Sequence, residues 1–271
     1  MRVRIVVLSL AACAAAATFA VAQQPGVSAR AEAPRAQGYL PPDMVPQVGR
    51  ILPPPPPEGS ERQKQDFDVY RNTRQLMGSS RWQLAQADNS YTVPYLLSAF
   101  SCSAGVQLTP QNAPKTATLV GRMLRDTGAT SAAAKDVFTR KRPYLYVDGP
   151  ICIDKTPGLA TSPDYPSGHA TLGYGVALVL AELMPDRATQ LLTRGRAYGE
   201  SRVVCGVHTV SAAQAGWTTA SAAVATLHGS PDFRADLEAA RAEIEELRET
   251  SDVHEGDSCL VENTLTARSP Y

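Results

Sequence analysis

The stretch Pro166-Ser167-Gly168-His169-Ala170-Thr171-Leu172-Gly173-Tyr174-Gly175 ends a proline-rich segment and begins an apolar run of helical character. Serine is a preferred N-cap residue, so the stretch predicts a helix that starts near Gly168. The first N–H groups of a helix have no partner within it, and the helix dipole makes this end partly positive, so such a start binds anions. Gly168 would let an anion approach the main chain, Ser167 would add a hydroxyl donor, and His169 would stand beside the anion as a general acid.

Helical periodicity continues on both sides of this stretch, and no run alternates as a strand would. Helices are expected at residues 60–84, 94–106, 113–125, 129–140, 168–184, 186–206, 209–227 and 232–248. Residues 141–165 contain four prolines and no helical period, which predicts a long loop, and long loops in compact domains are usually functional. The sequence therefore predicts an all-α fold, an irregular bundle of seven or eight helices.

The segments before this bundle predict export. Residues 1–22 combine Arg2 and Arg4 with an apolar run and the small residues Ala20-Val21-Ala22, which is the pattern of a cleaved signal peptide. We therefore expect a periplasmic or secreted protein. The stretch Leu10-Ala11-Ala12-Cys13 also resembles a lipoprotein box, so a lipid anchor on Cys13 is the alternative. No later apolar run is long enough to span a membrane.

Three further segments complete the expected organisation. Residues 23–59 form a proline-rich arm, in which Pro53 to Pro57 predict a polyproline II strut. We expect the arm to pack over the domain through its apolar residues: Leu40, Met44, Val45, Ile51 and Leu52. Residues 60–250 form one domain, and residues 251–271 form a C-terminal tail.

Composition limits the partners. The 271-residue chain has 26 basic and 26 acidic residues, so its net charge is about zero. This balance predicts no nucleic-acid partner, and any anion must bind through a local cluster of charges. The sequence leaves the oligomeric state open, a homo-oligomer included.

Four cysteines remain after the predicted cleavage: Cys102, Cys152, Cys205 and Cys259. In an oxidising compartment they permit two disulfides with three connectivities, among which the sequence does not choose. The alternative is that some remain buried thiols, with Cys102 and Cys205 the candidates because they lie in apolar stretches. Their spacings do not suggest a zinc site.

Three spaced motifs gather cations and imidazoles: Lys135-(six residues)-Arg142-Pro143, Pro166-Ser167-Gly168-His169, and Ser201-Arg202-(five residues)-His208. Together they resemble the signature of the type 2 phosphatidic acid phosphatase superfamily. More closely, the chain is similar to the bacterial class A non-specific acid phosphatases, which are all-α enzymes without a metal cofactor and relatives of the vanadium haloperoxidases. The resemblance covers roughly residues 39–240, including the polyproline arm and Phe100-Ser101-Cys102.

The resemblance assigns a role to each motif residue, and the chemistry agrees. His208 would be the nucleophile and would form a phosphohistidine, while His169 would protonate the leaving oxygen. Arginine forks and a lysine point charge suit the oxygens of a phosphoryl group, and these cations would take the place of a metal. The implied phosphate-binding residues are Lys135, Arg142, Ser167, Gly168 and Arg202.

One position departs from the family pattern. In the family pattern, three residues separate the nucleophilic histidine from an aspartate, and this chain has Ala212 at the aspartate's position. The aspartate would accept a hydrogen bond from the other imidazole N–H. Thr209 and Trp217 also differ from the usual tryptophan and arginine. Ser211 or a backbone carbonyl could orient His208 instead, or catalysis could be lost and an anion site retained. A third account brings in a carboxylate from the long loop, for which the candidates are Asp148, Asp154 and Asp164.

These observations predict a non-specific acid phosphatase that acts on small-molecule phosphate monoesters. A catalytically silent phosphate-binding homologue is the alternative that Ala212 motivates. A third reading keeps the fold and holds vanadate, as haloperoxidases do, but the closer resemblance is to the phosphatases. Because His169 must be protonated and His208 neutral, we expect a bell-shaped pH profile with an acid optimum.

Overall fold

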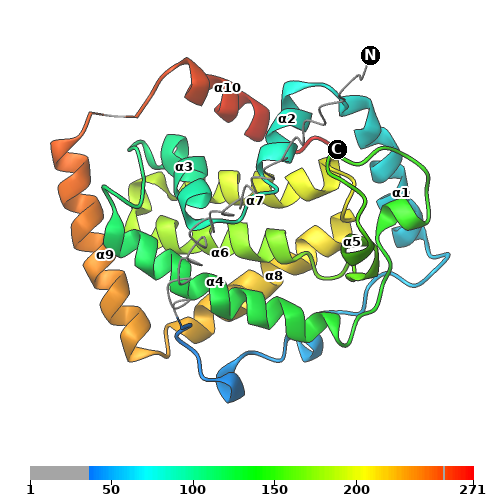
Figure 1. Ribbon diagram of the computed structural model, residues 1–271, viewed down its shortest axis with the longest axis horizontal. Coiled ribbons are helices and arrows are strands. Elements are labelled where there is room, and N and C mark those ends of the chain that lie inside the picture. The colour runs from blue at the N-terminus through cyan, green and yellow to red at the C-terminus, as the bar shows by residue number, and fades with distance from the viewer. Residues whose placement is uncertain (1–36, 253) are drawn as a thin grey trace, which may run out of the picture. The chain divides into compact units, whose positions relative to one another are not determined.

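The computed structural model describes residues 37–252 and 254–271, so the predicted signal peptide, Cys13 and the first part of the arm lie outside the described residues. The described part is all-α, without a strand, as the sequence predicts (Figure 1). Its α-helices are α1 (Glu61–Thr73), α2 (Ser80–Ala87), α3 (Val93–Ala104), α4 (Pro114–Lys135), α5 (Pro157–Thr161), α6 (Gly168–Leu183), α7 (Ala188–Val204), α8 (Val210–Leu227), α9 (Pro231–Thr250) and α10 (Asp257–Thr266). Short 3-10 turns lie at Pro42–Met44, Val48–Arg50, Arg74–Leu76, Pro143–Leu145 and Pro185–Arg187.

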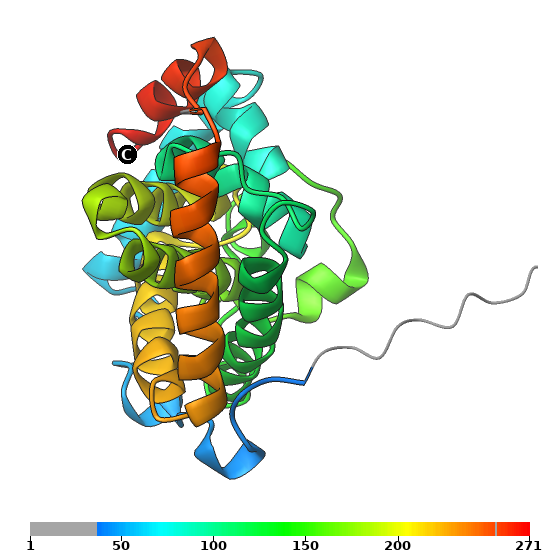
Figure 2. The ribbon, with the colours of Figure 1, turned by 90° about the vertical axis from the view of Figure 1, so that its left-hand side faces the viewer.

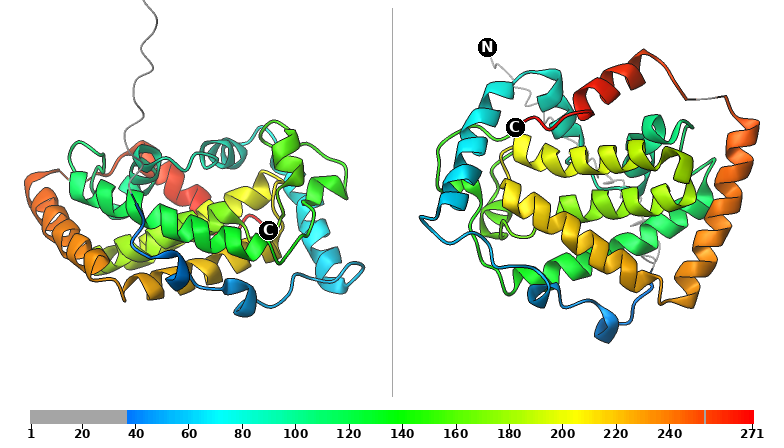
Figure 3. Two further views of the ribbon diagram at one scale, coloured as in Figure 1. Left: turned by 60° about the horizontal axis from the view of Figure 1, so that its bottom comes forward. Right: turned by 180° about the vertical axis from the view of Figure 1, so that it is seen from behind.

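Helix α6 lies at the centre of the bundle and packs against α4, α7 and α8 (Figures 1 and 3). Close approach is possible because glycines face the neighbouring helices. A Cβ on Gly173 of α6 would lie 2.2 Å from the Tyr198 ring of α7, and a Cβ on Gly216 of α8 would lie 2.7 Å from Ala170. Larger side chains at these positions would push the helices apart, so the glycines set the spacing of the core.

Helix α9 runs along the outside of the bundle and covers α4 (Figure 2). Its buried side chains, Phe233, Leu237, Ala240 and Ile244, recur at helical spacing and join the main apolar core. The opposite face carries its charged residues, as expected for an amphipathic surface helix. None of the helices in the described residues combines the length and the apolar character that crossing a bilayer requires.

Three predicted helices differ from those in the structure. The helix expected at residues 60–84 is interrupted, because Gly78 adopts a left-handed conformation (φ +80°) and Ser79 caps the new helix α2. The helices expected at 113–125 and 129–140 form one continuous α4, which ends at Lys135. A mid-helix glycine costs only about 1 kcal/mol. Burial of Met123 on one side of Gly128 and Ala134 on the other keeps the helix whole.

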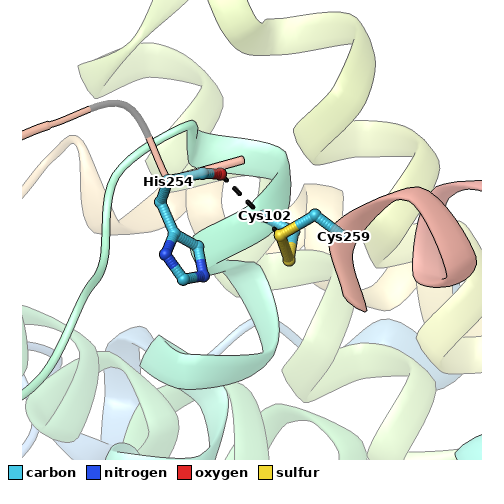
Figure 4. Close-up of side chains that lie close together, drawn as sticks. All are labelled: Cys102, His254 and Cys259. Atoms are coloured by element: carbon cyan, nitrogen blue, oxygen red, sulfur yellow. Dashed lines mark hydrogen bonds between the residues drawn. A yellow bond between two sulfur atoms is a disulfide. The ribbon is translucent and has the colours of Figure 1, made fainter. Parts of the chain in front are cut away.

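Helix α10 lies within residues 251–271 and was not expected from the sequence. A disulfide joins its Cys259 to Cys102 of α3, and Glu262 accepts a hydrogen bond from the buried Arg194 at 3.1 Å. His254 lies beside this disulfide (Figure 4), and its side chain and the two sulfurs lie within 4.8 Å of one another. Since both sulfurs are covalently joined, this group is a cross-link and offers no thiolate to a metal.

The second disulfide joins Cys152 in the long loop to Cys205 at the end of α7, and Cys152 N–H also donates to the Cys205 carbonyl at 2.9 Å. The pairing left open by the sequence is thus Cys102–Cys259 and Cys152–Cys205. The alternative of buried thiols at Cys102 and Cys205 is wrong, because both apolar stretches bring a partner cysteine within bonding distance.

The described part of the arm, residues 37–59, packs on the domain. Of its five expected anchors, Leu52 is buried, Leu40 and Val45 are half-buried, and Met44 and Ile51 are 48% and 55% exposed. Tyr39 and Val48 are the further buried residues of this segment that hold it. The expectation for Met44 and Ile51 was wrong: Met44 belongs to a 3-10 turn with no buried residue, and Ile51 follows a 3-10 turn of which Val48 alone is buried.

Candidate active site

The start of α6 has the predicted cap. Ser167 is buried, and its hydroxyl oxygen accepts a hydrogen bond from Ala170 N–H at 3.3 Å. Its own N–H donates to the carbonyl of Ala212 at 2.9 Å, which ties the start of α6 to the start of α8. A Cβ on Gly168 would meet only Ser131 Oγ, at 3.6 Å, so this face of the first turn is open. The beginnings of α6 and α8 lie with the ends of α4 and α7 near α5 (Figure 1).

A sharp turn after α7 carries His208 into the interior. Gly206 has a φ of +81°, a conformation that other residues rarely adopt. The Arg74 guanidinium donates to the carbonyls of Val203 and Val204, and a Cβ on Gly206 would lie 2.2 Å from it. After this turn, His208 N–H donates to the Arg202 carbonyl at 3.2 Å. The third motif therefore forms a compact turn in which the main chains of Arg202 and His208 are joined by a hydrogen bond.

His208 is only 3% exposed, and both of its ring nitrogens have partners. Arg142 Nη1 lies 3.0 Å from Nε2, and because an arginine can only donate, Nε2 is the acceptor. Nδ1 therefore carries the proton, and it donates to Asp164 through the carbonyl oxygen at 2.7 Å and Oδ1 at 3.0 Å. Burial, and then the positive charges of Arg142 and Lys135, hold the pKa of His208 well below its ordinary value. The imidazole is thus neutral, and the lone pair of Nε2 accepts the hydrogen bond from Arg142.

Three cations surround this imidazole. Arg142 Nε donates to the Ser162 carbonyl at 2.9 Å, and Lys135 Nζ donates to the Pro163 carbonyl at 2.9 Å. Burial and the nearby Arg142 lower the pKa of Lys135 to about 8. Burial also lowers the pKa of Arg202 to about 10. Cations in mutual repulsion inside a protein are stabilised by a bound anion.

Arg202 retains donors that the described residues do not use. Its Nη2 donates to Asn89 Oδ1 at 2.9 Å, whereas Nε and Nη1 are buried without a hydrogen-bond partner in the described part of the chain. The side chain is only 2% exposed. A buried N–H group without a hydrogen-bond partner costs free energy. The unpartnered N–H groups of Arg202 therefore indicate that the site binds the oxygens of an anion.

His169 lies at the same end of the bundle. Its Nε2–H donates to the Asn89 carbonyl at 3.0 Å, and Nδ1 makes no hydrogen bond to the described residues. The Tyr91 ring meets its imidazole edge to face, with centroids 5.2 Å apart. Burial, and then the charge of Arg202, hold the pKa of His169 well below its ordinary value. A bound anion would offset that charge and raise the pKa.

Direct contacts and shared partners bring the predicted site residues together. Arg142 contacts His208, and Arg142 and Lys135 both contact Ser162 Oγ. Arg202 and His169 both contact Asn89. Ser167 and Gly168 lie at the adjoining helix start. Among the three loop aspartates, Asp164 alone contacts His208, and Asp148 and Asp154 are exposed.

The sequence did not single out Asn89, which joins His169 to Arg202, or Arg140, which contacts Thr209 and Asp66. Asn89 belongs to a short turn between two helices and carries no local signal. Arg140 is next to Lys141 and Arg142, so a solvated run of charges was the ordinary interpretation. Only tertiary contacts identify these two residues.

Comparisons with known proteins show which family the chain belongs to. Residues 116–234, which contain all three motifs, match the model of the PAP2 superfamily. An acid phosphatase of Zymomonas mobilis is 43% identical over 214 residues, 79% of this chain and 81% of the relative. Non-specific acid phosphatases of Providencia stuartii and Salmonella typhimurium are 36% and 33% identical, over 73% and 71% of this chain and 81% and 78% of their own lengths. The chain belongs to the PAP2 superfamily and, within it, to the bacterial acid phosphatases.

Proposed function

We propose that this chain is an exported acid phosphatase that hydrolyses phosphate monoesters of small molecules through a phosphohistidine on His208. The observation that carries the proposal is a set of buried donors near His208. Arg142 Nη1 lies 3.0 Å from Nε2, and Arg202 Nε and Nη1 have no hydrogen-bond partner among the described residues. A transferring phosphoryl group carries negative charge on three equatorial oxygens, and its catalysis depends chiefly on positioning and electrostatic stabilisation.

The reaction follows in two balanced steps. The Nε2 lone pair of His208 attacks phosphorus in line, the phosphorus–oxygen ester bond breaks, and the protonated Nδ1 of His169 gives its proton to the leaving oxygen. The alcohol departs and a phosphohistidine remains. Water then attacks phosphorus, Nδ1 of His169 takes a proton from that water, and the phosphorus–nitrogen bond breaks. Inorganic phosphate is released, and His208 is again neutral.

An acid optimum fits the two imidazoles. The lowered pKa of His208 keeps the nucleophile neutral as the pH falls. Arg202 and burial lower the pKa of His169 in the free enzyme, so this general acid is protonated only under acid conditions until an anionic substrate offsets the charge. The working range lies between the two titrations.

Export is supported by the two disulfides, which persist in oxidising compartments. The test is the N-terminal sequence of the protein recovered from the periplasm or medium. We expect it to begin at Gln23. A lipidated N-terminus at Cys13 in the membrane fraction would contradict release by cleavage after Ala22.

The enzymatic test measures hydrolysis of a chromogenic aryl phosphate, a nucleoside monophosphate and a sugar phosphate from about pH 4 to 8 with EDTA present. His208→Ala should abolish turnover of all three, and parent enzyme quenched with denaturant at alkaline pH should carry an acid-labile phosphoryl group on His208. The matched control is His228→Ala, because His228 is a partly exposed residue that pairs with Glu182 away from the site. A parent that binds phosphate without turnover would instead identify a silent homologue.

A further inference from the structure

The position that carries the histidine-orienting aspartate in the family pattern is closed to a carboxylate in this chain. Ala212 is fully buried and belongs to an apolar cluster with Val48, Leu52 and Tyr165. Its methyl group accepts no hydrogen bond, and its N–H is used by Thr209 Oγ1, which caps α8. A carboxylate on this helix turn would have to enter the apolar contact between α8 and the arm, which is costly.

A carboxylate nevertheless reaches His208 from the other side. Asp164, in the loop before α6, is completely buried. Its Oδ1 accepts hydrogen bonds from His208 Nδ1–H at 3.0 Å and from Thr209 N–H at 3.1 Å. Its Oδ2 accepts from Thr209 Oγ1–H at 2.7 Å. Both oxygens are therefore held, and one of them faces the nitrogen that must keep its proton while Nε2 attacks.

We propose that Asp164 is the positioning residue of His208, and that this chain has moved the orienting carboxylate from helix α8 to the loop before α6. The inference rests on the proposed function of His208 as the nucleophile. Asp164 would fix the Nδ1–H tautomer and stabilise the positive charge that develops when Nε2 bonds to phosphorus.

Buried charges around Asp164 are arranged to accept that developing charge. Arg140 Nη1 lies 3.7 Å from Asp164 Oδ2, and its Nη2 donates to Asp66 Oδ2 at 2.9 Å. The Ser211 hydroxyl also donates to Asp66, at 2.6 Å. With both carboxylates ionised, Asp66, Arg140 and Asp164 carry one net negative charge. An ionised Asp164 would stabilise the imidazolium of a phosphorylated His208 through its hydrogen bond to Nδ1–H.

Two other groups could orient His208, and the structure separates them from the Asp164 carboxylate. Ser211 donates to Asp66 and contacts Thr209, but it makes no hydrogen bond to His208. The carbonyl of Asp164 does accept from Nδ1–H, at 2.7 Å, and it carries no net charge. A change confined to the Asp164 side chain leaves that carbonyl in place, so it isolates what the carboxylate adds.

The experiment compares Asp164→Asn with Asp154→Asn, an exposed aspartate of the same loop, and with His208→Ala. An asparagine can present its NH2 group to Nδ1 and so favour the unproductive tautomer. We expect Asp164→Asn to lower kcat on an aryl phosphate by about 10²-fold to 10⁴-fold, the range set by analogous carboxylates in serine hydrolases. KM and the affinity for inorganic phosphate should stay within about threefold, since the cations remain. Nitrogen NMR should show Nδ1–H on His208 in the parent and a changed tautomer in the variant.

Thr209→Val provides an independent variant if Asp164→Asn does not fold. It removes the hydroxyl that holds Asp164 Oδ2 but keeps the side-chain shape, and Thr209→Ser restores the hydroxyl. We expect the valine variant to lose on the order of 10-fold to 100-fold in kcat and the serine variant to recover most of it.

The outcomes distinguish a failure of the proposed role of His208 from a failure of the proposed role of Asp164. If His208→Ala remains active, the proposed function itself fails. If His208→Ala is inactive while Asp164→Asn and Thr209→Val keep the parent kcat, the backbone carbonyl suffices and Asp164 is not the positioning residue. A variant that loses phosphate affinity and kcat together, with the tautomer unchanged, would assign Asp164 a structural role only and would also overturn the inference.

Discussion

Replacing Arg202 with lysine tests whether its unpartnered nitrogens meet the substrate. Arg202 Nε and Nη1 together offer three N–H groups with no partner in the described residues, while Nη2 is held by Asn89. A lysine ammonium keeps the charge but cannot span two phosphoryl oxygens with a planar fork. At least one charge-assisted hydrogen bond is therefore lost.

Such a bond contributes about 1.5–3 kcal/mol. At 1.36 kcal/mol per tenfold change, Arg202→Lys should lower kcat/KM by about 10-fold to 150-fold. Arg202→Ala removes two such bonds and should cost about 10²-fold to 10⁴-fold. Both changes should also weaken inhibition by inorganic phosphate, because the same donors hold the product.

Initial rates on an aryl phosphate at the pH optimum measure this loss, and circular dichroism checks that the variants are folded. The matched control is Arg187→Lys, because Arg187 donates to the carbonyls of Cys102 and Ser103 away from the site. A folded Arg202→Lys enzyme whose kcat/KM stays within about threefold of the parent would refute the reasoning, since one lost charged hydrogen bond exceeds that change.

Three more predictions concern pH, ligand binding and packing. Burial and the charge of Arg202 lower the pKa of His169 in the free enzyme, and a bound anionic substrate offsets the charge of Arg202. The basic limb of the kcat profile should therefore lie at higher pH than the basic limb of the kcat/KM profile. Coincident limbs in steady-state profiles would contradict this. Inorganic phosphate at 100 times its Kd should stabilise the fold by about 2.7 kcal/mol in thermal unfolding, and an unshifted Tm would argue against an anion site. Gly173→Ala places a methyl group 2.2 Å from the Tyr198 ring and should lower the free energy of unfolding in urea by about 1–3 kcal/mol. Gly128→Ala, whose new methyl group has no neighbour within 4 Å outside its own helix backbone, should raise the free energy of unfolding by about 0.5–1 kcal/mol. Equal effects of the two changes would show that α6 and α7 can separate freely.

Local chemistry was sufficient to predict much of the fold, whereas the cation cluster was predicted from the resemblance of three spaced motifs to a known family. The Ser167 cap and the apolar run after it are features of a few adjacent residues, so the start of α6 follows from sequence. The incorrect helix bounds arose where tertiary burial outweighs the local helix propensity of a residue. Gly128 did not end a helix because burial on both sides outweighs its small propensity cost.

Other features depend on residues far apart in sequence. Helix α10 exposes Leu260 and Val261, so its apolar pattern is weak, and its position comes from the disulfide to α3 and the contact of Glu262 with Arg194. The choice among three loop aspartates likewise depends on the path of the loop, which Lys135 and Arg142 hold through the carbonyls before Asp164. Neither the position of α10 nor the contact of Asp164 with His208 leaves a periodic signal in the sequence.

The two disulfides have a consequence for a chain that is cut in the loop. Residues 154–158 are exposed, and Lys155 offers a trypsin-sensitive bond there. Cleavage after Lys155 would leave Lys135 and Arg142 on one fragment and His169 and His208 on the other. Both disulfides cross this point, since they join Cys102 to Cys259 and Cys152 to Cys205. The nicked protein would run as one species on a non-reducing gel and as two fragments after reduction, so survival in a protease-rich environment need not require an unbroken backbone.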